Sequence, residues 1–361
     1  MKSISGLLII LFMVSNCTKE PAPGSSVTNP GSSEQADWSI PITEVKDGGV
    51  GQDGIRSIDD PNIVEGLNAS IFLNDDELIL GLKYGQFAIA YPHKILDYHE
   101  IINHQIDDFA FSVSFCPLTG TGILYNRKIE QTETTFGVSG LLFNSNLIMY
   151  DRASGSLWPQ MMLKSVNGEH KDKDAVFGQL IETTWGTWKK WYPKSQVMAP
   201  NSGNGTNYNR YPYGDYRTND AYLLFSVPTK LKGIPQKERI LGIENNGEVL
   251  SSRFTTFTEG LNGFIEREVG GEKMFVFGSE KDNYMFSYFA QTEQGDPIEV
   301  ADLLIGKEEG GLFLDTEGNK WDIMGRAYEG DKTGMQLKVP VNYIGYAFAW
   351  AAFYPNYFVV E

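Results

Sequence analysis

Two residues of the chain, Cys116 and His99, have side chains that could build a nucleophilic or redox site. Cys116 ends an apolar run and is followed by Pro117 and Gly120, so the thiol is expected at the sharp exit of a strand. A histidine beside it could produce a thiolate nucleophile, with turn amides stabilising the anion. The pair could also bind a soft metal ion, although two ligands are too few to specify one, so metal content stays unknown. The plain alternative is a small buried apolar side chain.

Five further residues are candidates for binding a ligand near this thiol: Asn103, Thr119, Asp151, Arg152 and Trp158. A helix is expected to begin at Pro92, because Ile95, Tyr98, Ile101 and Ile102 share one face at a period of 3.6 residues. His99 falls in the apolar arc of this helix, and Asn103 lies one turn further on. Buried, both would need hydrogen-bond partners, so they are either structural ties or site residues.

Asp151 and Arg152 are neighbours at the end of a predicted strand, and their side chains should therefore point to opposite faces. One of them could enter a site, while a turn-capping role for Asp151 is the plainer interpretation. The sequence contains no GxSxG, HExxH, P-loop, GxGxxG or CxxC motif. No cofactor can be named from it, and whether the chain is an enzyme stays open.

The elements that would position these residues are mainly β, with a few short helices. Aromatic residues make up 13% of the chain and glycines number 38, a composition that favours strands and turns. Short apolar or β-branched runs, broken by Gly, Asn and Asp, predict strands at 70–73, 78–83, 86–90, 109–115, 122–126, 134–142 and 146–150.

An internal repeat divides the chain at an offset of about 162 residues. Trp188 and the Tyr-Pro that follows it match Trp350 and a second Tyr-Pro, and Gly168 matches Gly330. The segment from Asp151 to Trp158 matches a second Asp-to-Trp segment at 315–321. Two homologous tandem repeats, 55–193 and 232–361, are expected to pack as a pseudo-twofold pair, joined by a Tyr/Asn/Gly-rich connector at 194–231. Because thiol and imidazole occur only in the first copy, the second is expected to be a degenerate, supporting half.

The N-terminus predicts export and lipid anchoring. Lys2 precedes an apolar run at 7–14 that is too short to span a bilayer, so residues 1–16 are expected to be a cleaved signal peptide. Cys17 follows a small-residue region in the pattern of a bacterial lipoprotein, which predicts acylation of Cys17, for example with palmitate. Residues 17–45 are expected to form a flexible tether to the membrane. Acylation would leave Cys116 without an intramolecular partner. Thr18, the residue after Cys17, favours the outer membrane as the place where the lipid anchor is inserted.

The charge of the chain excludes one class of partner. A formal net charge of −16 and a pI near 4.8 argue against nucleic-acid binding, which depends on Lys and Arg neutralising phosphates. The expected partners are the membrane, through the N-terminal lipid, and a small molecule or an envelope protein.

Nine segments together give the chain a resemblance to DUF3179, a family of unknown function found in exported prokaryotic proteins: SIDDP at 57–61, AYP at 90–92, HEIIN at 99–103, CPLTGT at 116–121, FGVSGLL at 136–142, MYDR at 149–152, GSLW at 155–158, YPYGDY at 211–216 and KER at 237–239. At Pro159 the chain departs from the Ser or Asn usual in the family. The resemblance implies an envelope domain and supplies no activity, substrate or cofactor.

Two functional hypotheses follow from the sequence. The first is an envelope lipoprotein with a small-molecule or metal pocket around Cys116 and His99 in the first half. The second is a non-catalytic surface module that binds a protein or a glycan, for which the many Tyr and Trp residues would be suited.

Overall fold

The computed structural model describes residues 37–200, 205–228, 231, 233–258, 263–355 and 358–360. The predicted signal peptide, the predicted acylation site Cys17 and most of the predicted tether lie outside these residues. The last part of the predicted tether, residues 37–45, lies within the described residues. Ile40 is buried against Phe143, Ile148 and Val166, and the backbone then continues into strand β1. Residues 37–45 are therefore part of the folded domain.

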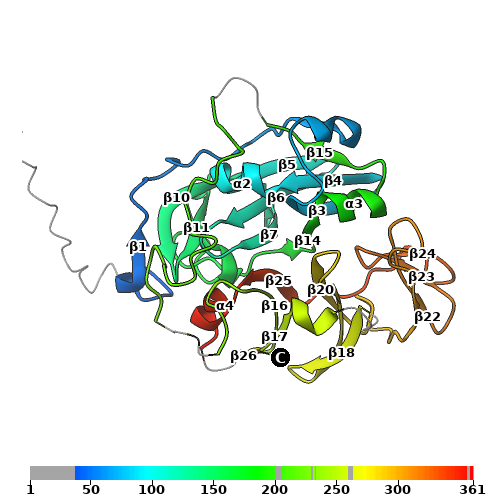
Figure 1. Ribbon diagram of the computed structural model, residues 1–361. Helices are drawn as coiled ribbons and strands as arrows, with labels where there is room; N and C mark the ends of the chain where they lie inside the picture. Colours follow the sequence, from blue (N-terminus) through cyan, green and yellow to red (C-terminus); the bar gives the residue numbers. More distant parts are fainter. Residues whose placement is uncertain are drawn as a thin grey trace, which may run out of the picture.

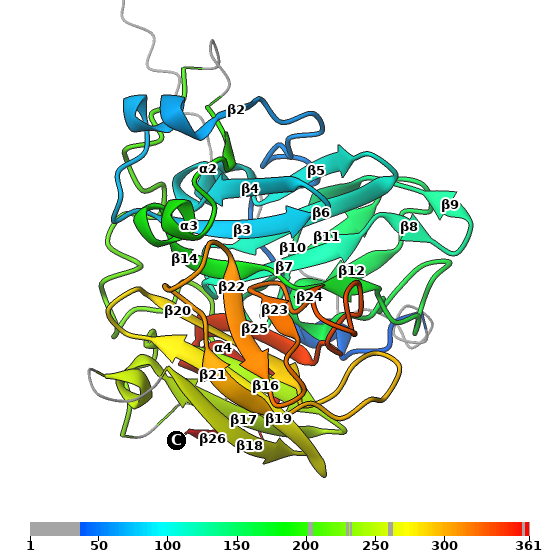
Figure 2. The same cartoon turned by 90° about the vertical axis from the view of Figure 1, so that its right-hand side faces the viewer.

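The first half forms three sheets (Figures 1 and 2). The first has the order β14-β3-β4-β15-β2, comprising β14 (Ile181–Thr184), β3 (Leu78–Tyr84), β4 (Phe87–Pro92), β15 (Gln196–Met198) and β2 (Ile63–Glu65). The second has the order β13-β7-β6-β5, comprising β13 (Phe177–Gly178), β7 (Thr121–Asn126), β6 (Phe109–Cys116) and β5 (Ile101–Ile106). The third has the order β1-β10-β11-β12, comprising β1 (Val45–Asp47), β10 (Phe136–Phe143), β11 (Asn146–Asp151) and β12 (Leu157–Pro159). A small ribbon joins β8 (Lys128–Ile129) to β9 (Thr132–Glu133).

The second half, drawn in yellow to red below the first, also contains three sheets (Figures 1 and 2). They have the orders β25-β16-β17-β26, β18-β19-β20 and β21-β22-β23-β24. The bounds are β16 (Arg239–Asn245), β17 (Glu248–Arg253), β18 (Phe264–Val269), β19 (Glu272–Ser279), β20 (Tyr284–Phe289), β21 (Val300–Leu303), β22 (Gly311–Asp315), β23 (Lys320–Asp322), β24 (Ala327–Glu329), β25 (Val341–Tyr346) and β26 (Phe358–Val360).

Helices are few and short, which confirms the predicted mainly β fold. The α-helices are α2 (His93–His99), α3 (Trp185–Trp191) and α4 (Ala347–Phe353), and the 3-10 helices are η1 (Ile42–Glu44), η2 (Gly66–Ile71), η3 (Gln160–Met162) and η4 (Phe254–Phe257). The strand predicted at 70–73 is wrong, since its first two residues end η2. The amides of Phe72 and Leu73 bond back to the carbonyl of Ala69, so this run closes a turn instead of pairing with a strand.

Helix α2 is shorter than the periodicity of the sequence predicts. It ends at His99 because Glu100 adopts a left-handed φ of 57°, and the β-branched pair Ile101 and Ile102 then enters β5. Asn103 therefore lies on a strand and not one turn beyond His99 on the same helix.

Corresponding contacts occur in the two halves. In the first, Trp188 of α3 packs on Gly81 of β3, where an added Cβ would lie 2.4 Å from the indole. In the second, Trp350 of α4 packs on Gly242 of β16, where the same distance is 2.0 Å. Parallel pairing of β15 with β4 likewise has a counterpart in β26 with β17. These contacts support the duplication, which stays a prediction.

The two halves share their hydrophobic core. One buried cluster joins Trp188 to Phe286, and another joins Tyr125 to Trp350. The halves are therefore joined by two buried clusters, and the first-half sites lie against second-half and connector residues.

Candidate functional site

His99 and Cys116 bond to different groups, and no hydrogen bond joins the two side chains. The His99 ring bonds through Nδ1 to the carbonyl oxygen of Arg56 at 2.8 Å and through Nε2 to the hydroxyl of Tyr208 at 2.7 Å. Burial lowers the pKa of His99, so its ring is neutral at pH 7. Both ring nitrogens thus tie the end of α2 to neighbouring segments.

Cys116 lies at the end of β6 and is 1% exposed. Its Sγ donates a long contact of 3.8 Å to the carbonyl oxygen of Ser145. Burial, together with the nearby negative charge of Glu100, raises the pKa of the Cys116 thiol to about 11. The group therefore stays a protonated thiol at neutral pH, which does not favour the thiolate chemistry that the sequence suggested.

Glu100 is the residue near Cys116 that sequence reasoning did not select. Its carboxyl is 6% exposed, and Oε1 accepts a hydrogen bond from the hydroxyl of Tyr213 at 3.0 Å. Burial, and to a lesser degree the charge of Asp97, raises the pKa of Glu100 to about 7, while the bond from Tyr213 opposes the shift. Glu100 has no ion-pair partner among the described residues. A buried carboxyl that titrates near neutrality is a recognised mark of a functional group.

A small cavity lies beside Glu100 and Tyr213. Its volume is about 70 Å³, and its other lining residues are mostly apolar: Gly48, Val50, Ile55, Leu118, Val138, Gly140, Leu141, Leu142, Leu147, Leu224 and Phe225. Such a volume holds roughly two water molecules or a short alkyl group. The wall comes from residues 48–55, β10, β11 and the connector, so only the tertiary fold assembles it.

Asp97 and Arg217 form a second polar contact between α2 and the connector. The guanidinium of Arg217 donates to the Asp97 carboxylate at 2.6 Å and stacks over the ring of Tyr211 at 4.1 Å. Burial raises the pKa of Asp97 to about 7, against the stabilising charge of Arg217. Two buried carboxyls three residues apart therefore titrate in the same range.

Asn103 and Arg152 meet at the carboxylate of Asp59. Asn103 Nδ2 donates to Asp59 Oδ1 at 2.6 Å, and Arg152 Nη1 donates to the same oxygen at 3.1 Å. Asn103 also accepts the backbone amide of Phe136 at 2.9 Å. Burial would raise the pKa of Asp59, but the bonds from Asn103 and Arg152 outweigh it and lower that pKa. Arg152 further reaches Asp53 at 3.2 Å. The cluster fastens residues 53–59 onto β5 and β10.

Thr119 belongs to a buried network of neutral polar side chains. It shares a hydrogen bond of 2.9 Å with Thr121, and Asn146 Nδ2 donates to it at 3.0 Å. Gln160 closes the network by accepting from Thr121 at 2.7 Å and from Asn146 at 2.9 Å. All four residues are fully buried. A satisfied network of this kind specifies a unique packing.

Asp151 and Trp158 form a turn-capping unit. Asp151 is fully buried, accepts the amide of Ser154 at 2.8 Å and accepts the indole N–H of Trp158 at 3.0 Å. The plainer interpretation of Asp151, a turn cap, is the one its bonds support. Trp158, only 1% exposed, is part of the core.

The described residues contain no group of three or more His, Cys, Asp or Glu side chains arranged to hold a metal ion. Within the same part of the chain, no helix is long and apolar enough to cross a membrane.

The comparisons with known proteins identify the family. The family model described as "Protein of unknown function (DUF3179)" matches residues 52–357. The chain belongs to the DUF3179 family. No curated protein and no solved structure matches it. The matched span of this DUF3179 member contains every polar cluster described above, and Glu100 and Tyr213 fall within the HEIIN and YPYGDY segments that carried the resemblance. Position within those segments was the signal that could have directed attention to both residues.

Proposed function

We propose that this DUF3179 member is an envelope protein that binds a small amphipathic amine in the cavity at Glu100. The single observation that carries the proposal is the buried Glu100 carboxyl, which lines an otherwise mostly apolar cavity and lacks a cation among the described residues. An ammonium group would supply the missing counter-charge, and a short alkyl chain would fill the apolar part.

Binding rather than thiolate chemistry is what the geometry supports. The Cys116 thiol is protonated at neutral pH, and Asn103, Thr119 and Asp151 are hydrogen-bonded to other side chains of the protein. The polar clusters therefore act as a frame that holds β5, β6, β10 and β11 around the cavity.

Titration with n-butylamine tests the proposal, with n-butanol as a neutral probe of similar size. Binding to the full chain in detergent can be followed by ligand-observed NMR between pH 6 and 8. We expect butylamine binding to strengthen as pH rises and Glu100 ionises, and Glu100→Gln to weaken it at least about tenfold. Glu169→Gln, a change at an exposed glutamate, should have no effect. Absence of butylamine binding, or equal binding to Glu100→Gln, would refute the proposal.

We further propose that an acyl group on Cys17 anchors the protein in the cell envelope, with the outer membrane as its site. The support is the short apolar run before Cys17. Metabolic labelling with an alkynyl palmitate analogue should modify the wild-type chain and not Cys17→Ser. Labelling that persists in Cys17→Ser would contradict the assignment.

A further inference from the structure

The hairpins β10-β11 and β21-β22 occupy corresponding places in the two halves. Asp151 at the end of β11 lies opposite Phe136 and accepts the indole N–H of Trp158 on the next strand, at 3.0 Å. Asp315 at the end of β22 lies opposite Val300 and accepts the indole N–H of Trp321 on its next strand, at 2.9 Å. By these contacts β21 is the counterpart of β10.

The outer edge of β10 is covered by the chain itself. Strand β1 pairs antiparallel with it, in a register that places Val45 opposite Phe143. Beyond β1, the amide of Gly48 bonds to the carbonyl of Gly140 and the amide of Asp53 to that of Val138, both at 2.8 Å. Residues 45–53 therefore complete the edge of this sheet.

The outer edge of β21 has no such cover among the described residues. In the order β21-β22-β23-β24 it is the terminal strand, paired only with β22. An edge strand offers unpaired backbone donors and acceptors to any extended chain that reaches it. Among its described residues, the second half therefore has no counterpart of β1 on this edge.

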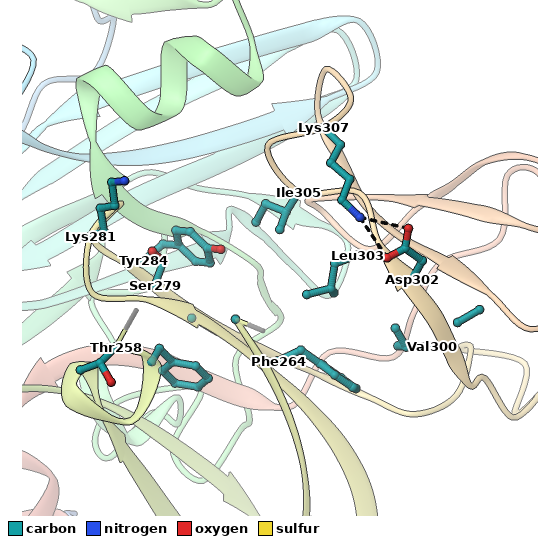
Figure 3. Close-up of a pocket in the computed structure, with 14 residues that line it drawn as sticks. Thr258, Phe264, Ser279, Lys281, Tyr284, Val300, Asp302, Leu303, Ile305 and Lys307 are labelled. Carbon is teal, nitrogen blue, oxygen red and sulfur yellow. Dashed lines mark hydrogen bonds and ion pairs between the residues drawn. The ribbon is translucent and has the colours of Figure 1, made fainter. Parts of the chain in front are cut away.

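A groove of about 580 Å³ lies along this edge (Figure 3). Val300, Leu303 and Ile305 form one wall, Tyr284, Ser279 and Thr258 face them, and Phe264 lies at the base. Tyr284 is 4% exposed and lines the groove. The groove therefore offers apolar contacts and a tyrosine side chain beside a strand edge that no other described strand pairs with.

The charged residues at the rim of the groove restrict which peptide segments can bind there. Asp302 on β21 pairs with Lys307 at 2.9 Å, and its carboxylate also accepts the backbone amide of Leu303. Charged side chains on an edge disfavour pairing with a purely apolar strand. An incoming segment with an acidic and a basic residue can replace this ion pair, its acidic residue pairing with Lys307 and its basic residue with Asp302. β1 itself has that composition, in the order Val45, Lys46, Asp47.

We propose that β21 binds an extended peptide segment of a partner protein, which adds antiparallel to its free edge as β1 does on β10. Alternate apolar side chains of the peptide enter the groove at Phe264 and Leu303, and its charged residues pair with Asp302 and Lys307. The site is separate from the cavity at Glu100, and either proposal can fail without the other.

A fluorescein-labelled copy of residues 42–49, ITEVKDGG, serves as the probe. Its binding to the full chain can be measured by fluorescence anisotropy, and its place by hydrogen exchange. We expect slowed exchange at Val300–Leu303 and at least about tenfold weaker binding to Leu303→Lys and to Phe264→Ala. Tyr328→Lys, on the opposite edge strand β24 of the same sheet, should bind normally, as should Glu100→Gln.

Four outcomes would overturn the proposal. The first is that the peptide does not bind. The second is that the peptide slows hydrogen exchange at β10, by replacing β1, and leaves exchange at β21 unchanged. The third is that chitin oligosaccharides slow hydrogen exchange of the same β21 amides while the peptide does not, which would make the groove a glycan-binding site. The fourth is that the chain dimerises through β21 and that Leu303→Lys abolishes the dimer, which would make a second copy of the chain the occupant of the groove. Melting curves and circular dichroism of each variant establish that loss of binding is not loss of fold.

Discussion

The carboxylate of Glu100 accepts a hydrogen bond from the hydroxyl of Tyr213 at 3.0 Å, across 113 residues of sequence. Glu100 directly follows the last residue of α2, and Tyr213 lies in the connector between the two halves. The bond holds the connector over the first half at the place where the cavity opens. Stability and the proposed ligand binding both depend on the protonation of Glu100.

The first prediction concerns the pH dependence of stability. The folded state binds the Glu100 proton more tightly than the unfolded state, because the pKa rises to about 7 from a model-peptide value of 4.5. The free energy of unfolding contributed by Glu100 is therefore greatest below pH 4.5 and falls by about 3 kcal/mol as pH rises through 7. Urea denaturation between pH 5 and 8 should show this slope flattened in Glu100→Gln. An unchanged slope would show that Glu100 is not the titrating group.

The second prediction concerns Cys116. A thiol that is 1% exposed, with a pKa of about 11, should react with DTNB far more slowly than a free thiol at pH 7.5. It should react at once in guanidinium chloride. His99→Ala should not alter the native rate, since His99 bonds to Arg56 and Tyr208. Rapid native labelling that depends on His99 would restore the thiolate hypothesis.

The third prediction concerns Asn103. The side chain is fully buried and bonds to Asp59, Phe136 and Ser112. Asn103→Ala should lower the free energy of unfolding by about 3 kcal/mol, because it leaves buried polar partners unpaired.

Arg152→Ala is the matched comparison for Asn103. The Arg152 side chain is 29% exposed, so the loss of its ion pair with Asp59 should cost less, on the order of 1 kcal/mol. Urea denaturation of the full chain would measure both losses. A larger loss for Arg152→Ala than for Asn103→Ala would reverse the order of importance inferred for this cluster.

The fourth prediction compares the two halves. Trp158→Phe and Trp321→Phe each remove one indole N–H bond to a buried aspartate, Asp151 or Asp315. Each should therefore lower stability by a similar amount, about 1–3 kcal/mol. Similar losses would support the proposed duplication. A loss confined to Trp158→Phe would show that the second aspartate-tryptophan bond has no equivalent structural role.

Local sequence patterns were enough for six of the seven strands predicted between residues 70 and 150, although no strand of the second half was predicted. The apolar runs at 109–115 and 146–150 became β6 and β11, because alternation and bounding turn residues are local properties. The helical pattern after Pro92 failed beyond His99. Ile101 and Ile102 fit the apolar face of a helix as well as they fit a strand. In the fold they belong to β5, where they lie opposite Ser114 and Val113 of β6.

The sequence by itself determined the mainly β class and the family segments, and it drew attention to Cys116. The tertiary structure alone decided what these residues do. It buried Cys116 and raised its pKa, because low-polarity surroundings disfavour a thiolate. It also replaced His99 with Glu100 and Tyr213 as the candidate functional pair. A carboxyl and a phenol 113 residues apart become partners only when the connector folds back over α2, which no local pattern encodes.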